Sequence, residues 1–272
     1  MGMLSFSEDE YAVHVTVRGE SVEILQEGLY KYNFKAMVGE GIAWDAVRVF
    51  FAVPLLIITF VFYLRGSLRG TLLFIGMLAN FFYQYLLWAI GWAFNPHFLI
   101  YIVCYSFSMV TIVLLFASMD KKQIRESISE KFPVRTISIF VLLIGLILVV
   151  MWLKEIIPAT RTNTIPLAFQ GANTLFVQAT DLGVIVPLVV LTGILLLKRN
   201  IYGYLLSSMA MLFFIAMALS ICSGVVLAGL RTGRMDAVGL IIFTLLGLVG
   251  VVFLYLVMKN IKPTKMRFTG RL

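Results

Sequence analysis

The chain has 272 residues, of which 61% are apolar and only 13% are charged, and its mean hydropathy is +0.97. Soluble globular proteins contain about 25% charged and about 45–50% apolar residues, so this composition excludes an ordinary soluble protein. Apolar runs long enough to cross a bilayer recur along most of the chain. The sequence therefore predicts an all-α, multi-span membrane protein with the lipid bilayer as its surroundings.

The first part of the chain, residues 1–42, predicts a small extracytoplasmic cap. The run YAVHVTV from Tyr11 alternates apolar and polar residues, RGE forms a turn, and SVEIL alternates again, which is typical of a β-hairpin. The aromatic residues Tyr30, Tyr32 and Phe34 alternate with polar ones, so this stretch forms either a third strand or an aromatic layer at the membrane interface. The cap is either purely structural or a lid that senses a ligand.

A seven-helix transmembrane domain is expected over residues 43–258, followed by a basic cytoplasmic tail, residues 259–272. Each span needs about 20 residues of helix to cross about 30 Å of hydrocarbon. No internal repeat is evident among the spans. Their expected ranges are Ala43–Leu64, Thr71–Ile90, Phe98–Ala117, Thr136–Leu153, Phe176–Leu197, Ile201–Leu227 and Ala237–Met258.

The distribution of Lys and Arg predicts an outside N-terminus and a cytoplasmic C-terminus in a cell (plasma) membrane. Cytoplasmic loops carry an excess of these residues. With this orientation, 14 of the 22 Lys and Arg residues fall inside, and 11 of the 14 acidic residues fall outside. The net charge of +8 is thus a gradient across the membrane. Because the basic residues are dispersed over four short segments, nucleic-acid binding is not expected.

The fifth predicted span carries the most informative polar residues. An ionisable side chain within a span costs about 2.5–3.5 kcal/mol on insertion scales, so Asp181 is a candidate functional residue. Gln178 and Thr174 precede it at helical spacing and would share its face. Pro187 follows six residues later and predicts a kink beside this polar face. The alternative is an interfacial Asp181 next to an inert kink.

Polar groups also occur in and after the second predicted span. Asn80 and Gln84 are four residues apart and face the same way, with Tyr83 beside Gln84. Such amides bind a ligand or, more simply, a neighbouring helix. His97 follows in a tight turn, where it is either a pH-sensitive ligand contact or a helix cap.

Several acidic residues fall at one membrane level on the predicted outer side. Asp45, Asp236 and Glu155 lie at or near span ends on the same side as Asp181, and together they would form a ring that attracts cationic ligands. The alternative is that carboxylates at helix N-termini interact separately with the helix dipoles.

The sequence predicts no cofactor and no metal. The seventh predicted span contains no Lys for a retinal Schiff base, and two His residues are too few for paired haem ligation in the membrane. The two Cys residues form no CxxC motif. No phosphate-binding loop or metal-ligand spacing is evident, and no catalytic residue is assigned.

Three segments carry a resemblance to known proteins. At LYKYNFKAMVGEGIAWD, FNPHFLIYI and VQATDLGVIVPLVVLTGILLLKRNIYGYLL, the chain resembles a group of uncharacterised multi-span proteins of bacterial membranes. The resemblance implies a context but no activity and no site residues.

The leading hypothesis is a plasma-membrane protein that binds or transports a small ligand through an outward-facing polar pocket. One alternative is a sensory or accessory subunit whose basic cytoplasmic segments bind a protein partner. Another is a membrane enzyme acting on lipid or quinone, with His97 paired to Asp45 or Asp181. The candidate ligand-binding residues are Asp181, Gln178, Thr174, Asp45, Gln84, Tyr83 and His97.

Single cysteines test the predicted orientation. In a chain whose Cys104 and Cys222 are replaced by Ala, Arg18→Cys should react with a membrane-impermeant maleimide in intact cells. Lys122→Cys should react only after the cells are opened, because it lies in a predicted cytoplasmic loop. The opposite labelling pattern would contradict the orientation.

Overall fold

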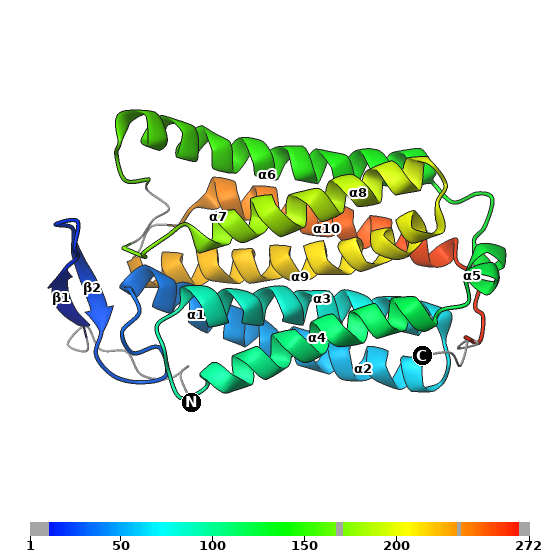
Figure 1. Ribbon diagram of the computed structural model, residues 1–272, viewed down its shortest axis with the longest axis horizontal. Coiled ribbons are helices and arrows are strands. Elements are labelled where there is room, and N and C mark those ends of the chain that lie inside the picture. The colour runs from blue at the N-terminus through cyan, green and yellow to red at the C-terminus, as the bar shows by residue number, and fades with distance from the viewer. Residues whose placement is uncertain (1–10, 167–170, 233–234, 267–272) are drawn as a thin grey trace.

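A computed structural model describes residues 11–166, 171–232 and 235–266 of the chain. Within these ranges, seven helices are long and apolar enough to cross a membrane, and a two-stranded hairpin precedes them. The predicted fold class, a seven-helix bundle with an N-terminal hairpin, is thus confirmed, and the long helices lie roughly side by side (Figure 1). The outermost parts of the predicted cap and tail, residues 1–10 and 267–272, lie outside the described residues.

The hairpin consists of β1 (Tyr11–Val15) and β2 (Ser21–Leu25), which pair antiparallel with Tyr11 opposite Leu25. Of the two alternatives for residues 30–34, the third strand is wrong. Phe34 makes only an isolated bridge to Ile24, because the chain reverses through residues with positive φ, Gly28 (84°) and Tyr32 (69°). The first helix then begins at Lys35, eight residues before the predicted start of the span.

The helices keep the predicted order, and some are longer than expected. The fourth span begins two residues early and runs nine residues past Leu153, through Pro158, to an end at Asn163, whose φ is 52°. The helical segments are α1 (Lys35–Val47), η2 (Arg48–Ala52), α2 (Val53–Leu64), α3 (Leu68–Gly91), α4 (Phe98–Ser118), α5 (Lys121–Ser127), α6 (Val134–Thr162), α7 (Phe176–Thr180), η4 (Asp181–Ile185), α8 (Val186–Leu197), α9 (Ile201–Thr232) and α10 (Ala237–Lys259).

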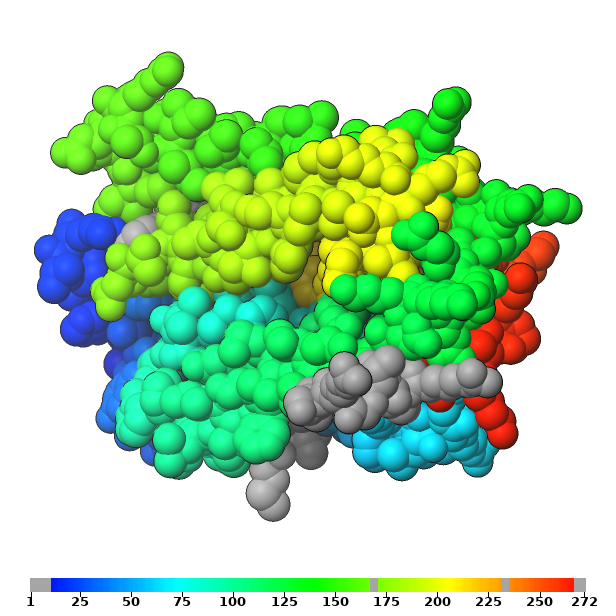
Figure 2. All heavy atoms as spheres, turned by 45° about the vertical axis from the view of Figure 1, so that its right-hand side comes forward, coloured from blue at the N-terminus to red at the C-terminus, as the bar shows by residue number. Residues whose placement is uncertain are grey.

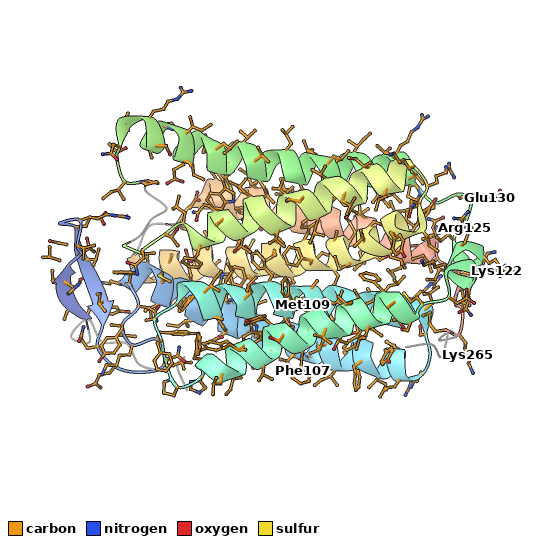
Figure 3. The ribbon with its side chains drawn as sticks, viewed as in Figure 1. Phe107, Met109, Lys122, Arg125, Glu130 and Lys265 are labelled. Atoms are coloured by element: carbon orange, nitrogen blue, oxygen red, sulfur yellow. The ribbon has the colours of Figure 1, made fainter. Side chains whose placement is uncertain are left out.

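The two ends of the bundle are named by the segments that lie at them. We call the end with β1 and β2 the hairpin end, and the end with α5 and residues 260–266 the tail end. At the tail end, charged residues such as Lys122, Arg125 and Lys265 gather, whereas apolar residues such as Phe107 lie along the bundle (Figure 3). The chain around α5 lies against the C-terminal segment (Figure 2), and Gln123 donates a hydrogen bond to the Lys265 carbonyl.

Helices α3 and α9 form the centre of the bundle and pack against each other. Around them, α2 and α4 pack on α3, while α1, α8 and α10 pack on α9. Helix α6 packs mainly on α8. Large side chains such as Ile75, Met77 and Met211 are fully buried along the two central helices. Each half of the chain therefore contributes one central helix.

The two halves contain a repeated segment. Two stretches of the chain match at a constant offset of 133 residues, at which Arg48 corresponds to Asp181. The first stretch runs from α1 through η2 and α2 into the start of α3. The second runs from α7 through η4 and α8 into the start of α9. The π-helical turns and helices α2 and α8 have equivalent bounds, and both central helices start at equivalent residues. Identical residues at this offset include Ala46 and Ala179, Pro54 and Pro187, Thr59 and Thr192, and Gly70 and Gly203.

The repeat extends to individual hydrogen bonds in the turn that precedes each central helix. The amide of Ser67 donates to the Phe62 carbonyl, and the equivalent amide of Asn200 donates to the Leu195 carbonyl. The residue before each donor has positive φ. The expectation that no internal repeat exists is therefore wrong. Two copies with few identical residues are hard to see in a sequence where most positions require only an apolar side chain.

Gly203 provides a test of the packing at this turn. A Cβ at Gly203 would overlap the backbone of Leu196, whereas a Cβ at Gly183 would meet nothing within 4 Å. We expect Gly203→Ala to lower the free energy of unfolding by about 1–3 kcal/mol, because overpacking forces backbone shifts. Thermal unfolding in detergent measures the effect, and Gly183→Ala is the matched control. Equal stability of the two variants would contradict this close approach.

Candidate functional site

Each copy of the repeat has a π-helical turn that begins at a buried charged residue and ends just before a proline. In the first copy, the amide of Val53 donates to the Arg48 carbonyl, and in the second that of Val186 donates to the Asp181 carbonyl. Pro54 and Pro187 cannot donate an amide hydrogen bond, so the regular pattern is interrupted at this level of both helices. Such single π turns occur frequently at functional sites.

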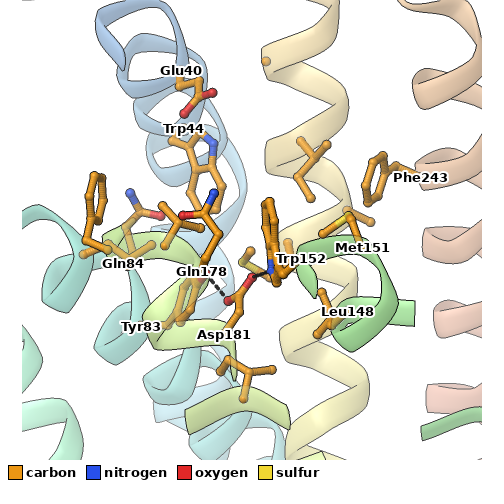
Figure 4. Close-up of a pocket in the computed structure, with 18 of the residues that line it drawn as sticks. Glu40, Trp44, Tyr83, Gln84, Leu148, Met151, Trp152, Gln178, Asp181 and Phe243 are labelled. Atoms are coloured by element: carbon orange, nitrogen blue, oxygen red, sulfur yellow. Dashed lines mark hydrogen bonds between the residues drawn. The ribbon is translucent and has the colours of Figure 1, made fainter. Parts of the chain in front are cut away.

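The carboxylate of Asp181 joins three helical segments. Its Oδ1 accepts a hydrogen bond of 2.6 Å from the Tyr83 hydroxyl of α3, and its Oδ2 accepts one of 2.9 Å from Trp152 Nε1 of α6 (Figure 4). Asp181 is only 7% exposed and Tyr83 only 1%. Both carboxylate oxygens thus have a donor from another helix, which offsets part of the cost of removing the charge from water.

A cavity of about 1870 Å³ lies beside this carboxylate. Its walls come from α1, α3, α6, α7 with η4, α9 and α10. Most of the lining side chains are apolar or aromatic. Tyr83, Gln84, Gln178 and Trp152 lie around Asp181, whereas Glu40 lies apart from them (Figure 4). Five of the seven candidate residues predicted from the sequence line this one cavity, namely Thr174, Gln178, Asp181, Tyr83 and Gln84.

Gln84 lines the cavity and has a buried hydrogen-bond acceptor without a partner among the described residues. This acceptor is Oε1, and the side chain is 3% exposed. An unpaired buried carbonyl costs about 1–3 kcal/mol, so a molecule that donates a hydrogen bond there would recover this energy. Gln178 is 5% exposed and lines the same space. Thr174 precedes α7 rather than sharing its helical face, since the helix begins at Phe176.

The equivalent of Asp181 in the first copy, Arg48, has different surroundings. Its guanidinium carbon lies 4.8 Å from the ring centroids of both Tyr85 and Trp88 and 5.6 Å from that of Phe81. Arg48 is 6% exposed, and its Nε and Nη1 have no hydrogen-bond partner within the described ranges. Aromatic faces attract this cation. Arg48 does not line the cavity beside Asp181.

Asp45 lies outside the cavity and connects the hairpin segment to α1. The hydroxyl of Tyr30 donates a hydrogen bond to Asp45 Oδ2. Tyr30 is fully buried, and its ring lies 5.0 Å from that of Trp92. Asp236 instead caps α10 by accepting a hydrogen bond of 2.9 Å from the Gly239 amide. Asp45, Asp181 and Asp236 thus occupy three separate settings, and only Asp236 lies at a helix N-terminus, whereas Asp45 and Asp181 lie within helical spans.

His97 is exposed in the turn before α4 and does not line the cavity. Its amide donates to Asn95 Oδ1, and its carbonyl accepts from the Tyr101 amide, so its backbone takes part in the helix start. Among the hydrogen bonds of the described residues, none joins its side chain to Asp45 or Asp181. The pairing on which the enzyme hypothesis depends is therefore not seen. Nor do the described residues include three His, Cys, Asp or Glu side chains grouped to hold a metal ion.

Sequence reasoning missed Trp152, Trp44 and Glu40, all of which line the cavity. Trp152 is the most important of these because it donates to Asp181. It stands near the end of an apolar run, where a Trp is usually expected at the membrane interface. Only the rotation of α6 against η4 brings its indole to Asp181.

The chain was compared with family models, with curated proteins and with solved structures, and no match was found in any of the three comparisons. The comparisons thus identify no family. The seven candidate spans of the described residues support a multi-span membrane protein.

The Tyr30 hydroxyl predicts a pH dependence of stability. Burial raises the pKa of Tyr30 well above its usual value of about 10, and the Asp45 carboxylate raises it further. A group with a raised folded-state pKa contributes stability that is present below the unfolded-state pKa and is lost as pH rises. We expect the free energy of unfolding to fall above about pH 10, and Tyr30→Phe to reduce this fall.

Chemical unfolding in detergent between pH 8 and 11 measures the difference between the wild type and Tyr30→Phe. Tyr32→Phe is the matched control, because Tyr32 is 56% exposed. Parallel pH profiles for the wild type and Tyr30→Phe would contradict a protonated, buried Tyr30.

Proposed function

We propose that the protein binds a small hydrogen-bond-donating ligand in the cavity beside Asp181. The observation that carries this proposal is the unpartnered Gln84 Oε1, buried on the wall of the same cavity as the Asp181 carboxylate. Ligand pockets typically combine an apolar lining with a small number of fixed polar groups. An ammonium or hydroxyl group would donate to Gln84 and lie near the negative charge of Asp181.

The position of the cavity is consistent with a ligand taken up from outside the cell. The residues that line its rim, including Lys35, Glu40 and Lys154, lie toward the hairpin end. We expect this end to face outward, because the basic segments lie at the other end. The charges on Lys35, Glu40, Lys154 and Asp181 sum to zero, so the charged residues that line the cavity do not together select a strongly charged ligand.

Transport is the form of this function that the repeat favours. Parallel repeats and interrupted helices beside a binding site are recurring features of secondary transporters. Here the repeat places equivalent π-helical turns in both halves, and one of them carries Asp181. A sensory role would require a partner at the tail end. There, part of the basic surface is used internally, since Arg69 Nε donates to the Ile261 carbonyl. A cytoplasmic partner stays a prediction from the sequence.

Binding is tested with purified protein and a panel of water-soluble primary amines and alcohols, starting with ethanolamine. A ligand of the folded state raises its stability by about 2.7 kcal/mol at a concentration of 100 times its Kd. We expect at least one compound to raise the thermal midpoint of the wild type. Asp181→Asn and Gln84→Leu should each abolish this rise, because they remove the charge or the acceptor.

Asn80→Leu is the matched control, since Asn80 is buried on the same helix as Gln84 but does not line the cavity. A rise that survives both Asp181→Asn and Gln84→Leu would contradict the site. For any compound that binds, flux into sealed proteoliposomes distinguishes transport from binding alone.

A further inference from the structure

The cavity has one wall that is also the outer surface of the bundle. Residues from α6 and from α10 line it, although α6 packs mainly on α8 and α10 packs on α9. Four of these lining residues are strongly exposed: Leu146 (58%), Ile147 (41%), Val150 (56%) and Ile242 (49%). A side chain that both lines the cavity and faces the outside marks an opening. The cavity therefore opens sideways, between α6 and α10.

This lateral opening is closed toward the tail end. The rings of Phe140 in α6 and Phe253 in α10 meet edge to face, with centroids 4.6 Å apart. On the hairpin-end side of this contact, the cavity is lined by Leu148 and Met151 of α6 and, across from them, by Phe243 of α10 (Figure 4). The opening thus extends from mid-bundle toward the hairpin end, at the level of Asp181.

The surface around the opening is apolar and lies within predicted membrane spans. On α10, Val238, Ile241 and Leu245 are 68%, 59% and 57% exposed. On α6, Leu143 is 49% exposed. The hydrocarbon of a bilayer is about 30 Å thick, so this part of α6 and α10 faces lipid chains rather than water. A molecule that passes through the opening must therefore be at least partly apolar.

We infer that the ligand is a membrane amphiphile, with a hydrogen-bond-donating headgroup beside Asp181 and Gln84 and a hydrocarbon chain between α6 and α10. This inference rests on the proposed function and specifies its ligand class. The polar end of the cavity offers acceptors, the Gln84 Oε1 and the Asp181 carboxylate, and its other end is apolar. The cavity of about 1870 Å³ has space for a headgroup together with part of a chain.

The acceptors at the headgroup site predict that a headgroup with a hydrogen-bond donor binds more tightly than one without a donor. Phosphatidylethanolamine carries an ammonium group with N–H donors, whereas phosphatidylcholine has a quaternary ammonium group without any donor. The Gln84 carbonyl accepts a hydrogen bond from the first and none from the second. Diacylglycerol, with a hydroxyl donor and no charge, separates the contribution of the hydrogen bond from that of the positive charge.

The experiment measures the binding of these three lipids, with identical acyl chains, to the delipidated full-length protein in detergent by native mass spectrometry. We expect phosphatidylethanolamine to bind roughly tenfold more tightly than phosphatidylcholine, because only its ammonium group donates a hydrogen bond to the buried Gln84 Oε1. Gln84→Leu should remove this preference. Val150→Trp and Ile242→Trp should weaken lipid binding by blocking the opening.

Leu143→Trp and Leu245→Trp are the matched controls, because both residues are exposed on the same helices and neither lines the cavity. Binding of water-soluble ethanolamine should be the same in all four Trp variants. Equal binding of ethanolamine and choline lipids, or lipid binding that Val150→Trp and Ile242→Trp leave at the level of the controls, would overturn the inference. Ethanolamine binding that depends on Asp181 would in that case still support the proposed function.

Discussion

The structure depends on one requirement, that a charge in a membrane span must be compensated by the protein itself. Asp181 meets it through the Tyr83 hydroxyl and the Trp152 indole. These donors come from α3 and α6, so the carboxylate fixes both helices relative to η4. The other charged residues that line the cavity, Lys35, Glu40 and Lys154, lie toward the hairpin end rather than beside Asp181.

The hairpin segment is attached to the bundle by a second carboxylate, the half-buried Asp45. Tyr30 reaches Asp45 from the loop after β2, and its ring packs against Trp92 at the end of α3. The Asn33 carboxamide oxygen accepts a hydrogen bond of 2.8 Å from the Ala93 amide, which ties the same loop to the start of the next connection. The loop between β2 and α1 is therefore part of the bundle's packing, and the hairpin itself projects from it (Figure 1).

The number and order of the spans could be predicted because the bilayer imposes length and hydropathy on each helix separately. The same local reasoning found Asp181, Gln178, Tyr83 and Gln84, since polar residues stand out in apolar runs. It did not find Trp152, whose role depends on how α6 is rotated against η4. It also placed Asp45 at the site, whereas the structure pairs this residue with Tyr30 outside the cavity. Pairings between distant helices are set by tertiary contacts, which leave no periodic signal in the sequence.

The equivalent positions of the two repeat copies carry opposite charges, Arg48 in the first and Asp181 in the second. A shared offset, shared turn geometry and shared prolines are what duplication of an ancestral segment would leave behind. After such a duplication, Arg48 became enclosed by aromatic rings, while Asp181 came to border open space. One copy thus surrounds its charged residue with aromatic rings, whereas the other places its charged residue beside the cavity. Because Arg48 does not line the cavity, the residues around Asp181 can change without altering the aromatic enclosure of Arg48.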